Sequence, residues 1–529
     1  MEAKLNRPGS KRLSAGWRNL RIGFSDWRAA AAAFEDFCDR RLALVLVVAS
    51  IIYFAVMYVQ SSLKTLWYDE FFTHFLALLP VARIWEATQS GAEVHPPLPA
   101  VSAHFAQTLF GPTAFATRLP EMIAFWGMSL ALFFLVRRYL GTCWAFTAVL
   151  FVFQSDAEGY ATEGRPYAIV MCCAAVALLC WQNLWSGRRW LCLIGIFLSL
   201  AAVVSANVMG VLIAVPLGVG ELYRTWRTRR IDFLFWIAAI AGASVLLVYL
   251  PMIHMAQRYL AHNSGGMGHM ASLFHLMELP LLPSLTPIVT VLIVVWMVNG
   301  VPANRGLTEG TYPPVSDLVA ATALFLLPVC QKILEHWTHS VNLRYTLSYV
   351  IGAALVFTYA CAWFSRRVPG AGFAAMAVLA ASVVCGGVLH YRAVHKLPRW
   401  PPEMNAAELP NLPILVDQGF HLFPVYWYNP ALRNRLYFVV SREDALRASG
   451  GDTVELNLSF ARDWFPVQLA DRKQFFYPGS KFLFYESAAE GVLFPDWQLD
   501  ACREMHASIN LVKQLSPADT LYEVDIPAQ

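Results

Sequence analysis

Long apolar runs follow one another through most of the chain, and this feature constrains the fold most strongly. Several of them extend over about 17 to 22 residues, enough for a helix to cross a hydrocarbon layer about 30 Å thick. Only 14% of the residues are charged, whereas soluble domains have about 25%. The sequence therefore predicts a polytopic membrane protein and excludes a soluble enzyme or a disordered chain. The net charge of +4 gives no reason to expect a nucleic-acid partner.

The basic N-terminal segment orients the first span. Residues 1–41 carry nine Lys and Arg residues, and the positive-inside rule places such a segment in the cytoplasm. Leu42 to Gln60 then crosses outward. No small-residue cleavage site follows this run, so we expect no signal peptide.

The stretch Pro97 to Phe110 decides the topology of everything after it. It has about 14 residues, roughly 21 Å as a helix, and contains Ser102, His104 and Gln107. We therefore expect a helix that lies in the outer interface or re-enters part way. Residues 61–119 then form one long external loop.

The remaining apolar runs alternate in direction so that every Arg cluster between two spans lies inside. Counting 97–110 as a span would put those clusters outside. The result is about 11 spans, and we expect a plasma (inner) membrane location. The spans after the first are 121–136, 142–155, 167–185, 190–206, 208–222, 233–250, 283–298, 318–332, 345–363 and 371–388.

Residues 389–529 have a different character, since charged residues return and short β-rich runs alternate with helical ones. They predict a small α/β domain outside the membrane. Strands are expected at 412–416, 436–440, 482–485 and 521–524, and helices at 442–448 and 495–507. The expected division is a cytoplasmic segment 1–41, a transmembrane domain 42–390, a linker 391–410 and an extracytoplasmic domain 411–529.

Two adjacent carboxylates, Asp69 and Glu70, follow the first span among aromatic residues. They are either ordinary interfacial acids beside an aromatic belt or a general base at the membrane surface, where partial desolvation can raise a carboxylate pKa.

About 25 residues later, His95 precedes a Pro pair that favours a helix start. It is either a solvated loop residue or an anion contact aided by the helix dipole.

Charges also lie at the external ends of later spans. Glu163 and Arg165 directly precede the span at 167–185, and charge at such a position is often functional. Carboxylates there could bind a hard divalent ion. Arg344 opens the span at 345–363, where it either reaches lipid headgroups or holds a phosphate by paired hydrogen bonds.

Taken together, these residues resemble the GT-C superfamily of integral-membrane glycosyltransferases, with the protein O-mannosyltransferases and the aminoarabinose transferases as nearest relatives. The resemblance lies in the order and spacing of motifs over residues 42–365. The motifs are Asp69-Glu70, Pro96-Pro97-Leu98, Arg118-Leu119-Pro120, Glu163 to Tyr167, and Arg344-Tyr345. The C-terminal domain resembles, more loosely, the external domain of some bacterial members.

The resemblance implies a fold and a reaction. The donor would be a sugar carried on a polyprenyl phosphate, transferred with inversion, and Asp69 would be the general base. Glu70 and Glu163 would complete the catalytic carboxylates. His95 stands where some relatives have a Lys that contacts the phosphate, and Arg344 and Arg165 would supply further cations.

The sequence also leads us to expect a cofactor and certain binding partners. Asp69, Glu70 and Glu163 could gather around a divalent cation. The acceptor would be a lipid, a polysaccharide or a protein. No Gly-rich nucleotide-phosphate loop is visible, in keeping with a lipid-linked donor.

Two other functions compete with sugar transfer. A transporter or flippase for a lipid-linked sugar would carry its charges mid-membrane, in broken helices of two matching halves, whereas these charges lie at span ends. A non-catalytic membrane assembly subunit would use the external domain to bind a partner and would not require Asp69.

Overall fold

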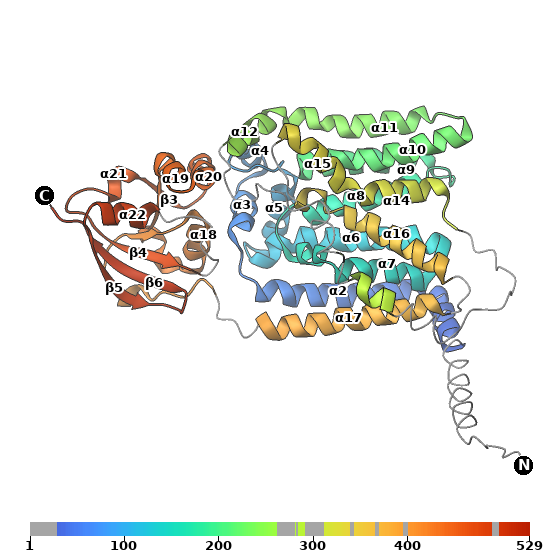
Figure 1. The fold of residues 1–529 in the computed structure, drawn as a ribbon, viewed down its shortest axis with the longest axis horizontal. Helices are drawn as coiled ribbons and strands as arrows, with labels where there is room; N and C mark the ends of the chain where they lie inside the picture. Colours follow the sequence, from blue (N-terminus) through green and yellow to red (C-terminus); the bar gives the residue numbers. More distant parts are fainter. Residues whose placement is uncertain are drawn as a thin grey trace, which may run out of the picture.

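The computed structural model describes residues 29–261, 281, 284–290, 312–338, 343–365, 370–394, 400–488 and 497–528. It consists of a bundle of apolar helices with a small α/β domain at one end (Figure 1). The predicted fold class, a polytopic helical protein with a small C-terminal α/β domain, is confirmed.

The bundle contains most of the predicted spans as helices. They are α2 (Leu42–Leu63), α6 (Ala114–Leu140), α7 (Thr142–Gln154), α8 (Tyr167–Gln182), α9 (Arg189–Ala206), α10 (Ala214–Thr228), α11 (Phe233–Ala243), α12 (Leu250–Ala261), α14 (Val315–Phe325), α15 (Leu327–Thr338), α16 (Tyr349–Phe364) and α17 (Ala371–Val394). The short helices η2 (Val208–Ile213) and η3 (Ser244–Tyr249) lead into α10 and α12.

Within the described residues, six helices are long and apolar enough to cross a membrane, or eight if each of two bent helix pairs is one span. The helices α7 and α16 are apolar but shorter, with 13 and 16 residues. Most of the predicted span 283–298 lies outside the described residues, as does the Arg pair at 366–367. The number of about 11 spans therefore stays a prediction.

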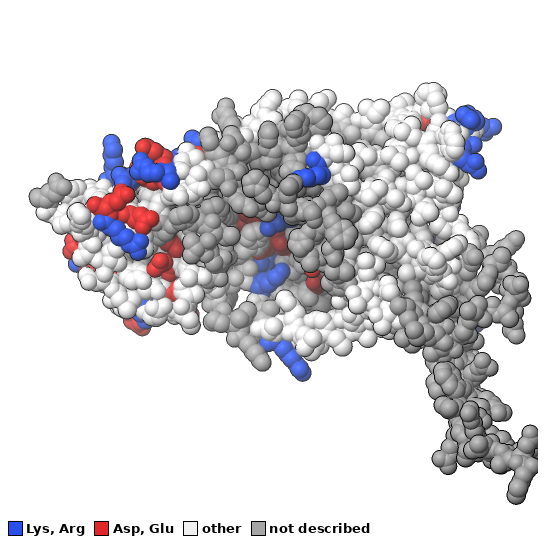
Figure 2. All heavy atoms as spheres, viewed as in Figure 1, with Lys and Arg blue, Asp and Glu red and all other residues white. Residues whose placement is uncertain are grey.

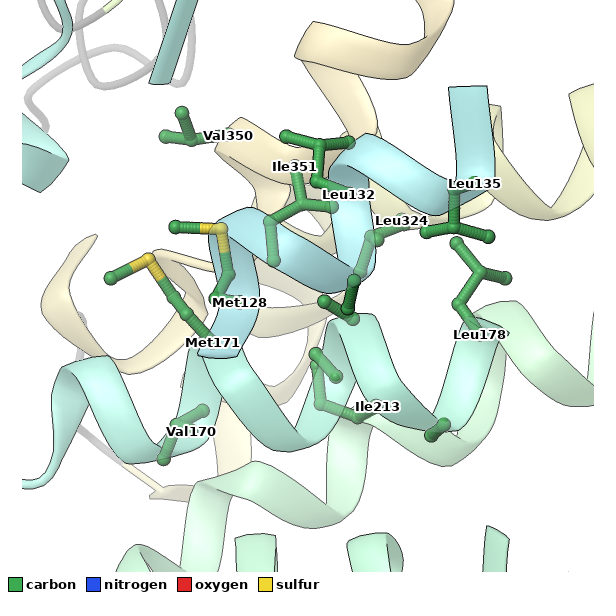
Figure 3. Close-up of a cluster of buried hydrophobic side chains, with 14 of the residues drawn as sticks. Met128, Leu132, Leu135, Val170, Met171, Leu178, Ile213, Leu324, Val350 and Ile351 are labelled. Carbon is green, nitrogen blue, oxygen red and sulfur yellow. The ribbon is translucent and has the colours of Figure 1, made fainter. Parts of the chain in front are cut away.

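The centre of the bundle is a tightly packed apolar core. Side chains from α6, α8, η2, α14 and α16 meet there, among them Met128, Met171 and Leu324 (Figure 3). Gly352 on α16 allows the closest approach, since a Cβ on it would lie 2.3 Å from the backbone nitrogen of Phe325. Small residues at such contacts let membrane helices pack backbone to backbone, so the ends of these helices are held by a rigid scaffold.

The helices α2 and α6 run antiparallel, and this fixes the path of the chain between them. The start of α2 meets the end of α6 through Asp39 and Arg137, at 2.9 Å. The end of α2 meets the start of α6 through Arg118, whose Nη1 lies 2.9 Å from the Ser61 carbonyl. Residues 64–113 therefore begin and end at the same end of the bundle, as the sequence predicted.

That intervening segment holds three short helices, α3 (Tyr68–Ala77), α4 (Val81–Gln89) and α5 (Leu98–Phe110). The predicted helix at 97–110 is present as α5, which has 13 residues, packs on α3 and α6, and does not cross the bundle. We call the end of the bundle that carries these helices the site end.

The opposite end, which we call the basic end, carries the Arg clusters. Charged side chains appear there, over the C-terminal domain, and toward the site end, while much of the bundle flank between them is uncharged (Figure 2). Ion pairs and hydrogen bonds join neighbouring helices at the basic end. They link Arg138 to Asn183, Arg189 to Asp232, and Arg224 to the Trp181 carbonyl.

The C-terminal domain is built on a six-stranded sheet of order β3-β2-β1-β4-β6-β5. The strands β3, β2, β1 and β4 are parallel, and β6 pairs antiparallel with both β4 and β5. Its elements are η5 (Ala406–Glu408), β1 (Ile414–Val416), α18 (Gly419–Tyr428), η6 (Pro430–Arg435), β2 (Leu436–Val440), α19 (Arg442–Ser449), α20 (Thr453–Ala461), β3 (Gln468–Asp471), α21 (Arg472–Phe475), β4 (Lys481–Ser487), α22 (Trp497–Glu504), β5 (Ser508–Gln514) and β6 (Asp519–Asp525).

The four predicted strands and both predicted helices are present, but two strands were missed. The strand β3 has only four residues, and β5 is an edge strand whose side chains are mostly exposed, so neither shows an apolar pattern. The helix α18 was also missed, because its sequence is aromatic-rich and contains Pro424, a composition that does not favour a helix interior.

Candidate active site

The short helix α3 places Asp69 and Glu70 in its first turn, where the helix dipole favours negative charge. Glu70 also caps this turn, since its Oε2 accepts a hydrogen bond from the Trp67 backbone N–H at 3.2 Å. Nine of the ten residues of α3 are buried, and Asp69 is the exception. The helix therefore presents one carboxylate and buries the other.

Glu70 is committed to a buried ion pair with Arg118. Its two oxygens accept from Arg118 Nε at 2.7 Å and Nη2 at 2.6 Å, and both side chains are 1% exposed. The backbone N–H of Gly164 donates a further hydrogen bond to Glu70 Oε1 at 2.7 Å. Glu70 thereby ties α3 to α6 and to the loop that carries Glu163 and Arg165.

Arg118 uses all five of its N–H groups. Besides the two bonds to Glu70, it donates to the backbone carbonyls of Ser61 (2.9 Å), Lys64 (3.0 Å) and Thr65 (2.9 Å). A guanidinium has five N–H donors and no acceptor, so none is left over. Arg118 closes the end of α2 and fixes where the chain enters α3.

Asp69 lies at the exposed edge of this hydrogen-bond network and is not part of the ion pair between Glu70 and Arg118. Its Oδ2 is 3.4 Å from Nη1 of Arg344, a long contact, and the side chains of Asp69 and Arg344 are 30% and 36% exposed. Arg344 belongs to the short helix η4 (Leu343–Thr346) and lies over the Trp67 ring, 5.4 Å from its centroid. A carboxylate and a guanidinium thus face each other where a ligand can reach both.

Glu163 follows the short helix η1 (Asp156–Thr162), in the turn before α8. Burial is the main cause that raises its pKa to about 7, and repulsion from Glu70 adds to this. The positive charges of Arg344 and Arg165 lower the pKa, but by less. Its Oε1 is buried and has no hydrogen-bond partner in the described part of the chain. Glu163 is therefore a carboxyl group with unused hydrogen-bonding capacity that can gain or lose a proton near neutral pH.

Arg165, Glu93 and His95 form a second buried cluster. Arg165 Nη1 donates to Glu93 Oε2 at 2.8 Å and to the Asp69 carbonyl at 2.9 Å. Nδ1 of His95 lies between Glu93 Oε1 at 2.9 Å and Arg165 Nη2 at 2.8 Å.

Glu93 and Arg165 stay ionised in this buried cluster because each is the counterion of the other. Burial opposes ionisation of Glu93, but Arg165 and His95 hold its pKa below the ordinary value. Burial and Arg165 lower the pKa of His95, which favours the neutral ring. Arg165 therefore holds the backbone of Asp69 in place, with Glu93 as its counterion.

The structure brings all six predicted site residues to the site end of the bundle. Two further residues, Glu93 and Arg118, were not assigned a role from sequence. Arg118 opens the motif Arg118-Leu119-Pro120, and Glu93 stands two residues before His95. A buried carboxylate or guanidinium beside a span needs a partner, and that requirement was the available signal.

A divalent cation was also predicted, with Asp69, Glu70 and Glu163 gathered around it. Among the described residues, no group of three or more His, Cys, Asp or Glu side chains is arranged to hold a metal ion. Glu70 has its oxygens occupied by Arg118 and Gly164, so any cation would depend on Asp69, Glu163 and groups of the substrate. The cation stays a prediction.

Comparison with known proteins agrees with the resemblance found in the motifs. Residues 94–255, from the loop before α5 into α12, match the family described as dolichyl-phosphate-mannose-protein mannosyltransferase. For these residues, the match confirms the resemblance to membrane glycosyltransferases. No curated protein sequence matches the chain.

The similar solved structures include two that cover most of the chain. Both are crystal structures of ArnT from Cupriavidus metallidurans. The apo form has 13% identity and a TM-score of 0.47, covering 92% of this chain and 98% of that one. The form bound to undecaprenyl phosphate has 14% identity and a TM-score of 0.49, covering 91% and 98%.

Proposed function

We propose that this chain is a membrane glycosyltransferase of the GT-C superfamily and transfers a sugar from a polyprenyl-phosphate donor to an acceptor hydroxyl outside the cytoplasm. The observation that carries the proposal is the pair Asp69 and Arg344. Asp69 is the one residue of α3 that is not buried, and it faces a half-exposed guanidinium across 3.4 Å. Sugar transfer from a lipid phosphate needs such a pair, a base for the acceptor and a cation for the leaving group.

The proposed reaction is a single displacement with inversion. Asp69 accepts the proton of the acceptor hydroxyl as that oxygen bonds to the anomeric carbon. The bond from the anomeric carbon to the phosphate oxygen breaks on the opposite face, and the electron pair leaves with the polyprenyl phosphate. Arg344 stabilises the phosphate by charge-assisted hydrogen bonds. Because a phosphate is already a good leaving group, no general acid is required.

The other cations and acids take supporting roles in this proposal. Arg165 spends Nη1 and Nη2 on Glu93, His95 and the Asp69 carbonyl, so it orients the base, while its buried Nε has no partner among the described residues. His95 lies beside Arg165 and would contact the donor phosphate. Glu163 would bind the acceptor or, with Asp69, a divalent ion that bridges to the phosphate.

The basic end of the bundle indicates which end of the protein faces the cytoplasm. The positive-inside rule puts that end in the cytoplasm, which leaves the site end and the C-terminal domain outside. A cysteine introduced at the exposed residue 82 or 462 should react with an impermeant reagent added from outside, and one at the exposed residue 227 should not. External labelling at residue 227 would overturn this orientation.

The proposed function is tested by reconstituted transfer from a panel of polyprenyl-phosphate sugars. Sugar transferred to an acceptor and lipid phosphate released should appear in equal amounts. A transporter or flippase would move the donor across the bilayer and release no lipid phosphate. Absence of both products with every donor would reject sugar transfer, and unchanged transfer in the presence of a chelator would reject the bridging ion alone.

A further inference from the structure

The helix α3 is held between the two parts of the molecule. On the bundle side, His74 Nδ1 lies 2.8 Å from Thr117 Oγ1 on α6, and Gln107 on α5 donates to the same hydroxyl at 3.0 Å. These contacts fix one face of α3 to the transmembrane domain. They leave its aromatic face, which carries Phe72 and Phe75, pointing away from the bundle.

The aromatic face of α3 packs on α18 of the C-terminal domain, which lies beside it (Figure 1). Phe423 of α18 is completely buried, with its ring centroid 5.3 Å from that of Phe72 and 5.5 Å from that of Phe75. It also stacks on Tyr68 at 5.3 Å with an interplanar angle of 12°. Tyr68 immediately precedes Asp69, so this contact reaches the residue beside the base.

A hydrogen bond reinforces the same junction. The backbone N–H of Leu66 donates to the Tyr428 hydroxyl at 2.8 Å, and Leu66 lies in the turn between α2 and α3. The C-terminal domain therefore contacts the chain on both sides of the α3 N-terminus.

A helix of ten residues is marginal by itself in water. The position of α3, and with it that of Asp69, must come from packing on its two sides. The bundle supplies one side, and α18 supplies the other.

We propose that the C-terminal domain contributes to catalysis. Phe423 and Tyr428 of α18 hold α3 in place and thereby position the base, Asp69. The inference rests on the proposed function for its catalytic consequence. Arg344 belongs to η4, whose main contacts are with η2 and α15 of the bundle, so donor binding depends less on this junction than the chemical step does. Loosening the junction should lower kcat and leave the KM for the donor nearly unchanged.

The test compares two Phe→Leu substitutions in the same domain. Phe423→Leu alters α18, in the core layer between the sheet and α3, whereas Phe484→Leu alters β4, in the core layer on the opposite face of the sheet. Both rings are completely buried, so both substitutions should destabilise the domain to a similar extent. The expected result is a fall in kcat of about tenfold for Phe423→Leu only, since small misplacements of a catalytic group are costly, with a donor KM within about twofold of the wild type.

A second variant keeps the packing and removes one atom. Tyr428→Phe retains the ring but leaves the Leu66 N–H without that acceptor, so a smaller fall in kcat is expected. It covers the case in which Phe423→Leu does not fold.

Hydrogen exchange supplies a readout that does not depend on sugar transfer. The amides of residues 68–77 should exchange faster in Phe423→Leu than in Phe484→Leu, with other bundle helices unchanged. Equal exchange in both variants, or a kcat that follows thermal stability equally in both, would overturn the proposal. If no donor supports transfer, the proposed function fails, and the exchange measurement alone still decides whether α18 holds α3.

Discussion

Asp69 and Glu70 are neighbours in the same helical turn, yet they lie on two different sides of the site. On the closed side, which we define as Glu70, Arg118 and Gly164, every carboxylate oxygen and every guanidinium N–H has a short hydrogen bond. The open side, which we define as Asp69, Glu163 and Arg344, is looser. The contact between Asp69 and Arg344 is long, and Oε1 of Glu163 has no hydrogen-bond partner among the described residues.

The difference shows that the charged residues of this site have two separate roles, one structural and one in the reaction. A buried ion pair is useful only when it is fully hydrogen-bonded, because breaking it leaves a charge without compensation. A reacting group needs the reverse, since a carboxylate that already accepts several short hydrogen bonds is a weaker base. The closed side therefore fixes the backbone, and the open side keeps its capacity for a substrate.

Removing the closed side should have the largest effect on stability. Arg118→Ala leaves Glu70 buried without its counterion and deprives three backbone carbonyls of their donor. The expected loss of stability is about 3–5 kcal/mol, measured by thermal unfolding in detergent. The exposed pair Arg447–Glu443 provides the matched control, and Arg447→Ala should change the unfolding temperature very little. A similar small change for Arg118→Ala would show that the closed side is not structural.

On the open side, Arg344→Ala should weaken catalysis without unfolding the protein. Losing a charge-assisted bond to the phosphate should lower both donor affinity and rate, together by about 10- to 100-fold. Initial rates over a range of donor concentrations would measure both, and Arg344→Lys should restore part of the loss. Unchanged kinetics with a small loss of stability would assign Arg344 to the lipid headgroups instead.

A third expected effect, on stability rather than on rate, concerns its dependence on pH. The folded protein raises the pKa of Glu163 from 4.5 to about 7, so the folded state favours the protonated form. Glu163 therefore costs nothing at low pH and becomes destabilising as the pH rises from about 4.5 through 7. Glu163→Gln removes this cost and should raise stability relative to wild type by up to about 3 kcal/mol between pH 4 and pH 8. A pH-independent difference between the two proteins would contradict the burial of this carboxyl group.

Much of this organisation could be predicted from the sequence, for reasons that differ between the two sides. The apolar runs and Arg clusters predict the helices and keep 97–110 out of the span count, because hydropathy and charge act locally along the chain. The open-side residues stand at the ends of spans, where a charged residue is conspicuous. Those positions allowed Asp69, Glu163 and Arg344 to be predicted as site residues from the sequence.

The closed side could not be predicted in the same way. Nothing in the dipeptide Asp69-Glu70 says which acid is buried, because that depends on Arg118, which lies 48 residues beyond Glu70. The docking of α18 on α3 joins Tyr428 to Leu66 across 362 residues. Such pairings depend on tertiary packing, and a single sequence carries no periodic signal for them.

The most direct test of the account is a matched pair of isosteric substitutions, Asp69→Asn and Glu70→Gln, assayed for transfer per folded molecule and for thermal unfolding. Asp69→Asn should unfold like the wild type and lose a factor of about 100 or more in rate, since it cannot accept the acceptor's proton. Glu70→Gln should lose about 3–5 kcal/mol of stability, because Arg118 then lacks its counterion. Normal transfer by Asp69→Asn, or a folded Glu70→Gln protein of normal stability that has lost its activity, would contradict the assignment of chemistry to Asp69 and structure to Glu70.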